Sequence, residues 1–458
     1  MKFLKIYIRI VAIAAFISVI LQYGFTIPNR FTLYILGLNM FIALSFAFNA
    51  IVRLVVSPNK LRTIRSNILE YILLFLIILQ LLVWHGFWEK LSPYFQNLNI
   101  FSLTNLYIIT LQLYILATLI LKLPSVNAIL SGLRIPPPLI VIGSFSFVIL
   151  LGTLLLLLPK ATYMRISFID ALFTATSAVC VTGLVVLDIG RQFTTFGQFI
   201  ILLLIQVGGL GIMTITSFFA LILRGELGIK ERRVLGDILN FRTFSQLKTL
   251  VNSIFWTTIV IEIIGALLMY TRFTKYQGIN DASPLWNAIF HSVSAFCNAG
   301  FSLFPRNFAH FVKDKELSFI AMALIVLGGI GFVVIRDILS AVSALLRRRS
   351  QVVRLMLQTR IVLKMTLFLI VVGAFVFLII ENNNLLAGLT LTEKLVASLF
   401  QSVTARTCGF NTVDIGLISL PAMMLLILLM FIGASPGGTG GGIKTTTAAI
   451  LAGLIRAR

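Results

Sequence analysis

Apolar segments long enough to cross a lipid bilayer recur along the whole chain. Four lie near residues 4–23, 31–52, 67–86 and 103–122, and six more follow at 137–158, 195–223, 248–270, 316–345, 360–381 and 420–455. A helix of about 20 apolar residues spans the hydrocarbon core of a membrane. The pattern therefore predicts an all-α polytopic membrane protein with ten membrane helices.

A shorter pattern is written three times between these helices. The copies at 171–184, 288–301 and 398–410 read ALFTATSAVCVTGL, AIFHSVSAFCNAGF and SLFQSVTARTCGF. Each places small and hydroxyl residues before a glycine, and each has an apolar helix on either side. A recurring unit indicates repeated architecture. We therefore divide the chain into an accessory domain of four helices (1–133) and three helix–pore-loop–helix repeats (134–246, 247–358 and 359–458).

Composition supports the membrane prediction and orients the helices. Apolar residues make up 59% of the chain and charged residues only 11%, whereas a soluble domain averages about 25% charged residues. The net charge of +22 fits basic cytoplasmic loops and attraction to anionic lipid. Nucleic-acid binding is not expected, because no soluble domain with a basic face is visible. Basic clusters after the second helix of each repeat place the motif on the outer side.

Each motif predicts a short helix followed by an extended return of the chain. Helix-capping residues precede the three copies: Ser167 with Asp170, Ser283 followed by Pro284, and Thr390 with Glu393. A helix C-terminus carries a partial negative charge, so several such ends that converge would stabilise a dehydrated cation. Gly183, Gly300 and Gly409 give the return the freedom to turn carbonyl groups toward an ion, as in potassium filters.

Two acids follow these motifs, and two further charged residues lie inside apolar stretches. Asp188 and Asp414 each follow the motif glycine by five positions. They are candidates for an acidic outer mouth that concentrates cations, and the alternative is a pair of solvated loop acids. Glu262 and Arg406 stand in apolar surroundings, which is costly unless they are paired. We interpret both as filter supports, and an ion-binding role for a pore-facing Glu262 stays open.

Glycine clusters recur in the second helix of each repeat. At 208–211 and 328–331 they favour close packing through small residues. The stretch 433–442 contains a proline and too many glycines to hold a regular helix, so we predict an irregular loop below the filter that blocks or opens the pore. The candidate gate residues are Gly437, Gly438, Gly440, Gly441, Gly442 and Lys444. A nucleotide-binding loop is rejected because Ile443 separates Gly442 from Lys444.

The three cysteines, Cys180, Cys297 and Cys408, all lie within the motif. A three-cysteine metal site is one interpretation, and small buried side chains in a tight loop are the interpretation that we favour. The three histidines are isolated, and no catalytic grouping of His, Cys or carboxylate side chains is visible. An enzyme is therefore not expected.

Four stretches closely resemble motifs of the Trk/Ktr/HKT superfamily of potassium transporters, nearest the bacterial Trk-type membrane subunits: TSAVCVTGL, HSVSAFCNAGF, TARTCGFNTVD and IGASPGGTGGGIKTTT. The resemblance covers about 135–458. It implies four helix–pore-loop–helix repeats around a pseudo-fourfold axis with one central pore. It also implies K+ uptake across the bacterial inner (plasma) membrane, with K+ as the transported ion and no organic cofactor.

By match to the family's filters, the ion-facing backbone groups belong to three triplets: Val181, Thr182 and Gly183; Asn298, Ala299 and Gly300; and Thr407, Cys408 and Gly409. The stretch 433–444 matches the family's gating loop. The resemblance further implies a homodimer and a cytosolic ring of nucleotide-binding regulatory subunits. No fourth copy follows within the 458 residues. We expect a truncated or frameshifted product, or else a second polypeptide that supplies the fourth repeat.

Two alternatives to a K+ pore stay open. An alternating-access carrier for another solute also uses discontinuous helices. Such carriers are typically built from inverted repeats, whereas these three copies run in the same order. The second alternative is a non-functional fragment of a potassium transporter.

Overall fold

The computed structural model describes residues 29–57, 137–210, 244–276, 282–346 and 355–457, with a few single positions before residue 72. The chain divides into two compact units, Met1–Leu133 and Arg134–Arg458. In the first unit, helix α2 (Asn29–Val56) corresponds to the predicted apolar segment 31–52. The other three helices predicted for this unit lie largely outside the described residues.

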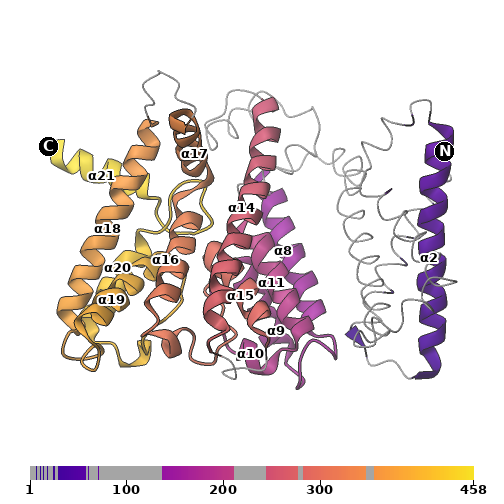
Figure 1. The fold of residues 1–458 in the computed structure, drawn as a ribbon, viewed down its shortest axis with the longest axis horizontal. Coiled ribbons are helices and arrows are strands. Elements are labelled where there is room, and N and C mark those ends of the chain that lie inside the picture. Colours follow the sequence, from indigo (N-terminus) through magenta and orange to yellow (C-terminus); the bar gives the residue numbers. More distant parts are fainter. Residues whose placement is uncertain are drawn as a thin grey trace. The chain divides into compact units, whose positions relative to one another are not determined.

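The second unit is built from helices (Figure 1), and the predicted all-α architecture is confirmed over its described residues. The helices are α8 (Pro137–Leu156), α9 (Phe168–Val179), α10 (Ile189–Gln192), α11 (Thr195–Gly209), α14 (Phe244–Phe273), α15 (Pro284–Phe296), α16 (Lys315–Ile330), α17 (Phe332–Leu346), α18 (Leu357–Glu381), α19 (Leu391–Ala405), α20 (Leu420–Phe431) and α21 (Thr445–Ala457), with short turns η3 (Ala309–Phe311) and η4 (Ile415–Leu417). The short helices α9, α15 and α19 gather toward the lower end of the view, whereas α17 and α21 lie at the upper end.

The three repeats follow one another by the same neighbour relation. Each consists of an apolar helix, a short helix and a second apolar helix, which are α8, α9 and α11 in the first repeat. Helix α11 packs against α15 of the second repeat, and α16 of the second repeat packs against α19 of the third. In both cases the second helix of one repeat contacts the short helix of the next. Repeats related by rotation about a common axis make contacts of this kind, whereas many carriers are built from inverted repeats.

Two described helices are each long and apolar enough to cross a bilayer, within Asn252–Phe273 and Leu357–Glu381. A third span is possible if Lys315–Ile330 and Phe332–Ala344 are taken together, but these two helices are bent by 104°. The shorter apolar helices include α9, which carries the first copy of the motif. This mixture of full spans and short helices is typical of folds in which chain segments enter a membrane without crossing it.

The second helix of the second repeat departs from our prediction. We predicted a continuous helix over 316–345, and this is wrong, because the helix breaks at Gly331 with a φ of +91°. Glycine adopts this left-handed conformation without the clash that a Cβ atom would cause. In the third repeat the predicted interruption is confirmed, since α20 ends at Phe431 and α21 begins at Thr445.

The predicted starts of the three short helices are confirmed. In α9, Ser167 Oγ accepts a hydrogen bond from the Asp170 N–H at 3.1 Å, and Asp170 accepts one from the Ser167 N–H at 3.4 Å. Ser283 caps α15 through its side-chain oxygen, and Glu393 accepts from the Thr390 N–H at 2.9 Å. These bonds satisfy N–H groups that have no partner inside the helix. Each short helix is therefore begun by its own local sequence.

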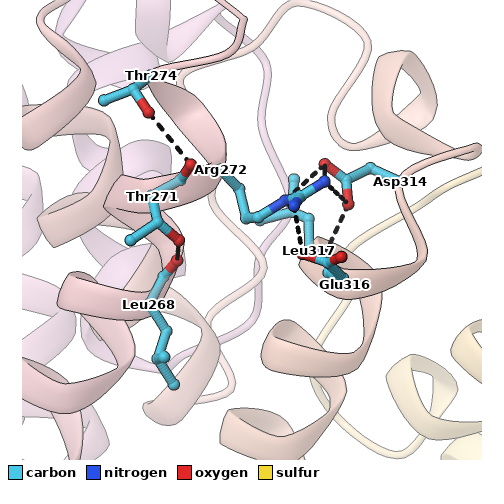
Figure 2. Close-up of polar contacts among 7 residues, drawn as sticks. All are labelled: Leu268, Thr271, Arg272, Thr274, Asp314, Glu316 and Leu317. Carbon is cyan, nitrogen blue, oxygen red and sulfur yellow. Dashed lines mark hydrogen bonds and ion pairs between the residues drawn. The ribbon is translucent and has the colours of Figure 1, made fainter.

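An ion-pair cluster joins helices α14 and α16 of the second repeat (Figure 2). Arg272, in the last turn of α14, donates from Nη2 to Asp314 at 3.0 Å and also contacts Glu316. Asp314 caps α16 by accepting from the Leu317 N–H at 3.0 Å. The Asp314 side chain is fully buried, while 15% of the Arg272 side chain is exposed. The cluster fixes the end of α14 against the start of α16, on either side of α15.

Replacement of Arg272 by methionine is expected to lower the stability of the second repeat by about 3 kcal/mol, because the Asp314 carboxylate would stay buried without its countercharge. Thermal unfolding of the purified protein in detergent measures the effect. The matched control is Lys275→Met, which removes an exposed positive charge on the same segment. Equal unfolding temperatures for the two variants would show that the cluster adds nothing to stability.

Candidate functional site

The three predicted triplets share one backbone conformation. The first residue of each triplet has a positive φ, which is +54° at Val181, +59° at Asn298 and +83° at Thr407. The third residue does too, with +79° at Gly183, +68° at Gly300 and +97° at Gly409, and the residue between them does not. Residues other than glycine rarely adopt this conformation. Its recurrence at the same position of three copies points to a functional constraint on the backbone.

This alternation affects where the carbonyl groups point. Along a regular strand, successive residues face opposite sides, whereas alternating handedness turns successive carbonyl groups toward the same side. Among the described residues, none of the nine triplet carbonyl oxygens accepts a hydrogen bond. Carbonyl groups inside proteins are usually paired. The lack of a described partner thus sets the nine triplet oxygens apart from most carbonyl groups inside a protein.

The three triplets lie against one another. A Cβ atom on Gly183 would lie 2.5 Å from the Ala299 carbonyl oxygen and 3.4 Å from that of Cys408. A Cβ atom on Gly300 would lie 2.2 Å from the Cys408 carbonyl oxygen, and one on Gly409 would lie 3.8 Å from the Gly300 Cα atom. Segments that are far apart in the chain thus meet through backbone atoms. The glycines at 183 and 300 are required here because the neighbouring backbone occupies the space of a side chain.

The two acids assigned to the outer mouth have local roles as helix caps. Asp188 Oδ1 accepts hydrogen bonds from the backbone N–H groups of Gly190 at 2.9 Å and Arg191 at 3.0 Å. Asp414 Oδ1 accepts from the Gly416 N–H at 3.0 Å. The shared Asp-Ile-Gly pattern could have revealed these caps, since aspartate before a glycine-containing turn commonly accepts from the backbone. The neighbouring loops are held in shape by these bonds.

Glu262 braces two repeats at the base of the second triplet. Gln206 of α11 donates to Glu262 Oε2 at 3.1 Å, and the Cys297 thiol lies 3.7 Å from Oε1. Ser292 of α15 donates to the Glu262 backbone carbonyl at 2.7 Å. Cys297 directly precedes Asn298, so the Glu262 carboxyl group contacts the residue next to the second triplet. Gln206 was missed in the sequence, because its partner lies 56 residues away.

Arg406 links the third triplet to the glycine-rich loop. Its guanidinium donates from Nη2 to the Gly433 carbonyl at 3.2 Å, and its Nε has no hydrogen-bond partner among the described residues. Arg406 is 8% exposed and follows the last residue of α19, where the negative end of the helix favours a positive charge.

The cysteines differ in burial: Cys297 and Cys408 are buried as predicted, whereas Cys180 is exposed.

The glycine-rich loop, defined here as residues 432–444, fills the break between α16 and α17. The Ser435 N–H donates to the Gly329 carbonyl at 2.9 Å, and the Phe332 N–H donates to the Gly437 carbonyl at 3.2 Å. A broken helix leaves carbonyl and N–H groups without partners, and the loop provides partners for both sides of the break. The expectation of plain helix packing at 328–331 missed this because the complementary segment lies about a hundred residues later in the chain.

The same loop contacts two of the triplets. Asn298 donates from Nδ2 to Thr439 Oγ1 at 3.0 Å, and Thr439 in turn donates to the Phe296 carbonyl at 3.2 Å. A Cβ atom on Gly440 would lie 2.0 Å from Thr407 Oγ1, so the loop backbone lies directly on the third triplet. Lys444 donates to the Gly440 carbonyl at 2.8 Å. The predicted gate residues and the predicted filter residues are thus brought together.

Comparison with known proteins places this arrangement in a family. Residues 137–458 match the family model described as TrkH, a cation transport protein. The Ktr system potassium uptake protein B of Bacillus subtilis is 40% identical over 323 residues, covering 70% of each chain. The potassium/sodium uptake protein NtpJ of Enterococcus hirae is 40% identical over 321 residues, covering 69% of each chain.

The fold is also similar to a solved structure. The crystal structure of the potassium transporter TrkH from Vibrio parahaemolyticus superimposes with a TM-score of 0.51 at 21% identity, covering 70% of this chain and 63% of that chain. This likeness supports the fold, and the family match extends over more than half of the residues. The protein is a multi-pass membrane ion transporter and not an enzyme. The chain belongs to the TrkH family of cation transport proteins.

Proposed function

We propose that the chain forms a K+-selective pore for K+ uptake across the bacterial inner membrane. The observation that carries the proposal is the meeting of three triplets with the same alternating backbone and with free carbonyl oxygens. Carbonyl oxygens arranged around one point replace the hydration shell of K+ in selective filters. The ends of α9, α15 and α19 add partial negative charge beside the triplets. The Bacillus relative, which is named a potassium uptake protein, supports K+ as the cargo.

Ion uptake by cells that produce the protein tests this function. In a bacterial strain without K+ uptake systems of its own, the protein is expected to restore growth at low external K+ and to drive K+ uptake well above Na+ uptake. The control is the same strain with an empty vector. Transport of an unrelated solute with no K+ dependence would instead support an alternating-access carrier. Equal uptake of K+ and Na+ would refute selectivity.

The glycine-rich loop is proposed as the gate of this pore. It lies against the first residues of the second and third triplets, through Asn298 and Thr407. Gly437 and Gly442 have φ values of +76° and +74°, which allow sharp turns that other residues disfavour. Lys444 is tied back to the loop and adds positive charge beneath the filter. Movement of the loop away from the triplets would open a path for the ion.

The surroundings of the pore are proposed from charge and from family resemblance. Asp188 and Asp414 bring negative charge to the loops after the first and third triplets, which would concentrate cations at the outer mouth. A separate chain of similar architecture is proposed for the fourth side of the filter. Exposed apolar side chains on the long helices, such as Phe368 and Phe375, face membrane lipid.

Association with other subunits is also proposed. The name of the Bacillus relative describes it as one component of a Ktr system. We propose that this chain forms a homodimer that works with a cytosolic ring of nucleotide-binding regulatory subunits. Light scattering of the purified protein distinguishes a dimer from a monomer, and co-purification from the native membrane shows whether a nucleotide-binding partner is present.

A further inference from the structure

One hydroxyl group in the last turns of each short helix is bonded to the chain beyond the filter glycine. Ser177 Oγ donates to the Leu184 carbonyl at 2.7 Å, Ser294 Oγ to the Phe301 carbonyl at 2.8 Å, and Thr404 Oγ1 to the Phe410 carbonyl at 2.8 Å. In every case the acceptor is the residue directly after the motif glycine. We call these three bonds the hydroxyl tethers.

The tethers are independent of exact spacing. They join residues seven apart in the first two repeats and six apart in the third. The third motif is one residue shorter, yet the same carbonyl group is bonded. The hydroxyl-bearing residues are buried, with exposed fractions of 4%, 0% and 3% for Ser177, Ser294 and Thr404. The same carbonyl group is bonded in the longer and the shorter motif, so the bond is a shared feature that a fixed helical spacing does not produce.

The tethers divide the carbonyl groups into two classes. The carbonyl after each glycine is turned back to the short helix, whereas the described residues give no hydrogen bond to the nine triplet carbonyl oxygens. Glycine rotates freely about its backbone bonds, so the peptide group between glycine and the next residue would be free to turn without a tether. The triplet is therefore held at one end by the short helix and at the other by the hydroxyl group.

We propose that Ser177, Ser294 and Thr404 are positioning residues that determine the K+ over Na+ selectivity of the filter. The inference rests on the proposed function. Na+ is smaller than K+, and a ring of carbonyl oxygens can coordinate it well only if the ring contracts. A triplet fixed at both ends resists contraction, whereas a triplet that is free at its outer end can follow the smaller ion. Loss of a tether would thus favour Na+ more than it would reduce total ion flow.

The third repeat offers the sharpest test. Thr404→Val keeps the shape of the side chain and removes the hydroxyl group, whereas Thr404→Ser keeps the hydroxyl group. We expect Thr404→Val to lower the K+/Na+ uptake ratio about three- to tenfold, which is the range for loss of one hydrogen bond, with total cation uptake retained. Thr404→Ser should retain the ratio. The matched control is Ser398→Ala on the same helix, because Ser398 Oγ is buried and has no hydrogen-bond partner in the described part of the chain. This substitution should leave the ratio unchanged.

A second variant guards against misfolding. Ser294→Ala removes the tether of the second repeat while leaving a small side chain in place, and it should lower the ratio in the same range. Both variants are first checked for a single elution peak in size-exclusion chromatography. If Thr404→Val and Ser294→Ala keep the native ratio while Gly300→Ala loses it, the tether proposal is overturned and the pore function stands. If all three keep the native ratio, the proposed filter itself is wrong.

Discussion

Replacing Gly300 with alanine is expected to abolish K+-selective uptake. The new Cβ atom would lie 2.2 Å from the Cys408 carbonyl oxygen and 3.1 Å from the carbonyl carbons of Cys408 and Gly409. All of these are backbone atoms, so the overlap cannot be relieved by rotation of a side chain. The φ of +68° adds a conformational cost of about 1–2 kcal/mol for a residue with a Cβ atom.

The expected size of the effect follows from these two costs. Overpacking in a tight site costs about 1–3 kcal/mol, and 1.4 kcal/mol corresponds to a factor of about ten in an equilibrium. Displacement of the Cys408 carbonyl should therefore lower the K+/Na+ uptake ratio at least about tenfold. Uptake of 86Rb+ as a K+ tracer, compared with that of 22Na+, measures the ratio in cells with matched protein levels.

Two further glycines give this prediction its controls. Gly409→Ala should have a smaller effect, because a Cβ atom there meets its nearest neighbour at 3.8 Å, although the φ of +97° still causes strain. Gly388→Ala should be neutral, since nothing lies within 4 Å of its Cβ position. The prediction fails if the folded Gly300→Ala protein keeps the native ratio, or if all three variants lose it equally.

The parts of the fold that were predicted correctly depend on local sequence. Ser167, Ser283 and Thr390 begin short helices through bonds to residues within three positions, so the helix starts could be found in the sequence. The interruption at 432–444 follows from proline and glycine, which cannot continue a helix. The threefold motif also identified three segments whose triplets lie against one another, because similar sequences adopt similar local backbones.

The parts that were missed depend on partners far along the chain. The break at Gly331 is completed by Ser435 and Gly437, which no local pattern indicates. The same holds for Glu262, whose partner Gln206 lies on a different repeat. The tethers cross six or seven residues of irregular chain. The serine and threonine residues can be seen in all three motifs. The carbonyl groups that they bond are known only from the structure of the chain after each glycine.

Replacing Thr439 with valine is expected to raise the rate of K+ uptake while the K+/Na+ ratio stays native. Valine has nearly the shape of threonine but lacks the hydroxyl group that accepts from Asn298 Nδ2 and donates to the Phe296 carbonyl. The backbone bond from the Thr439 N–H to the Gly328 carbonyl at 3.1 Å would remain. The loop would thus keep its path and lose its side-chain attachment to the second triplet.

Whether the uptake rate rises or falls depends on the state of the pore in which the Thr439 side-chain hydrogen bonds are formed. If the loop must leave the triplets for the pore to open, the two side-chain bonds stabilise only the closed state. Asn298 is fully buried, and leaving its amide without a partner costs about 1–3 kcal/mol. In the variant this cost applies only to the closed state, because the Asn298 side chain can bond to water once the loop has moved away. A shift of 1.4 kcal/mol raises the open fraction about tenfold where that fraction is small.

Rate and selectivity together separate this result from damage to the filter. Single-turnover K+ flux into proteoliposomes gives the rate, and the same preparation gives the K+/Na+ ratio. Thr447→Val is the matched control, since Thr447 is exposed and lies beyond the loop in α21. A faster flux with a native ratio means that the attachment holds the gate shut. A slower flux, or a lower ratio without any gain in rate, would mean that Thr439 supports the second triplet and that the gate is controlled elsewhere.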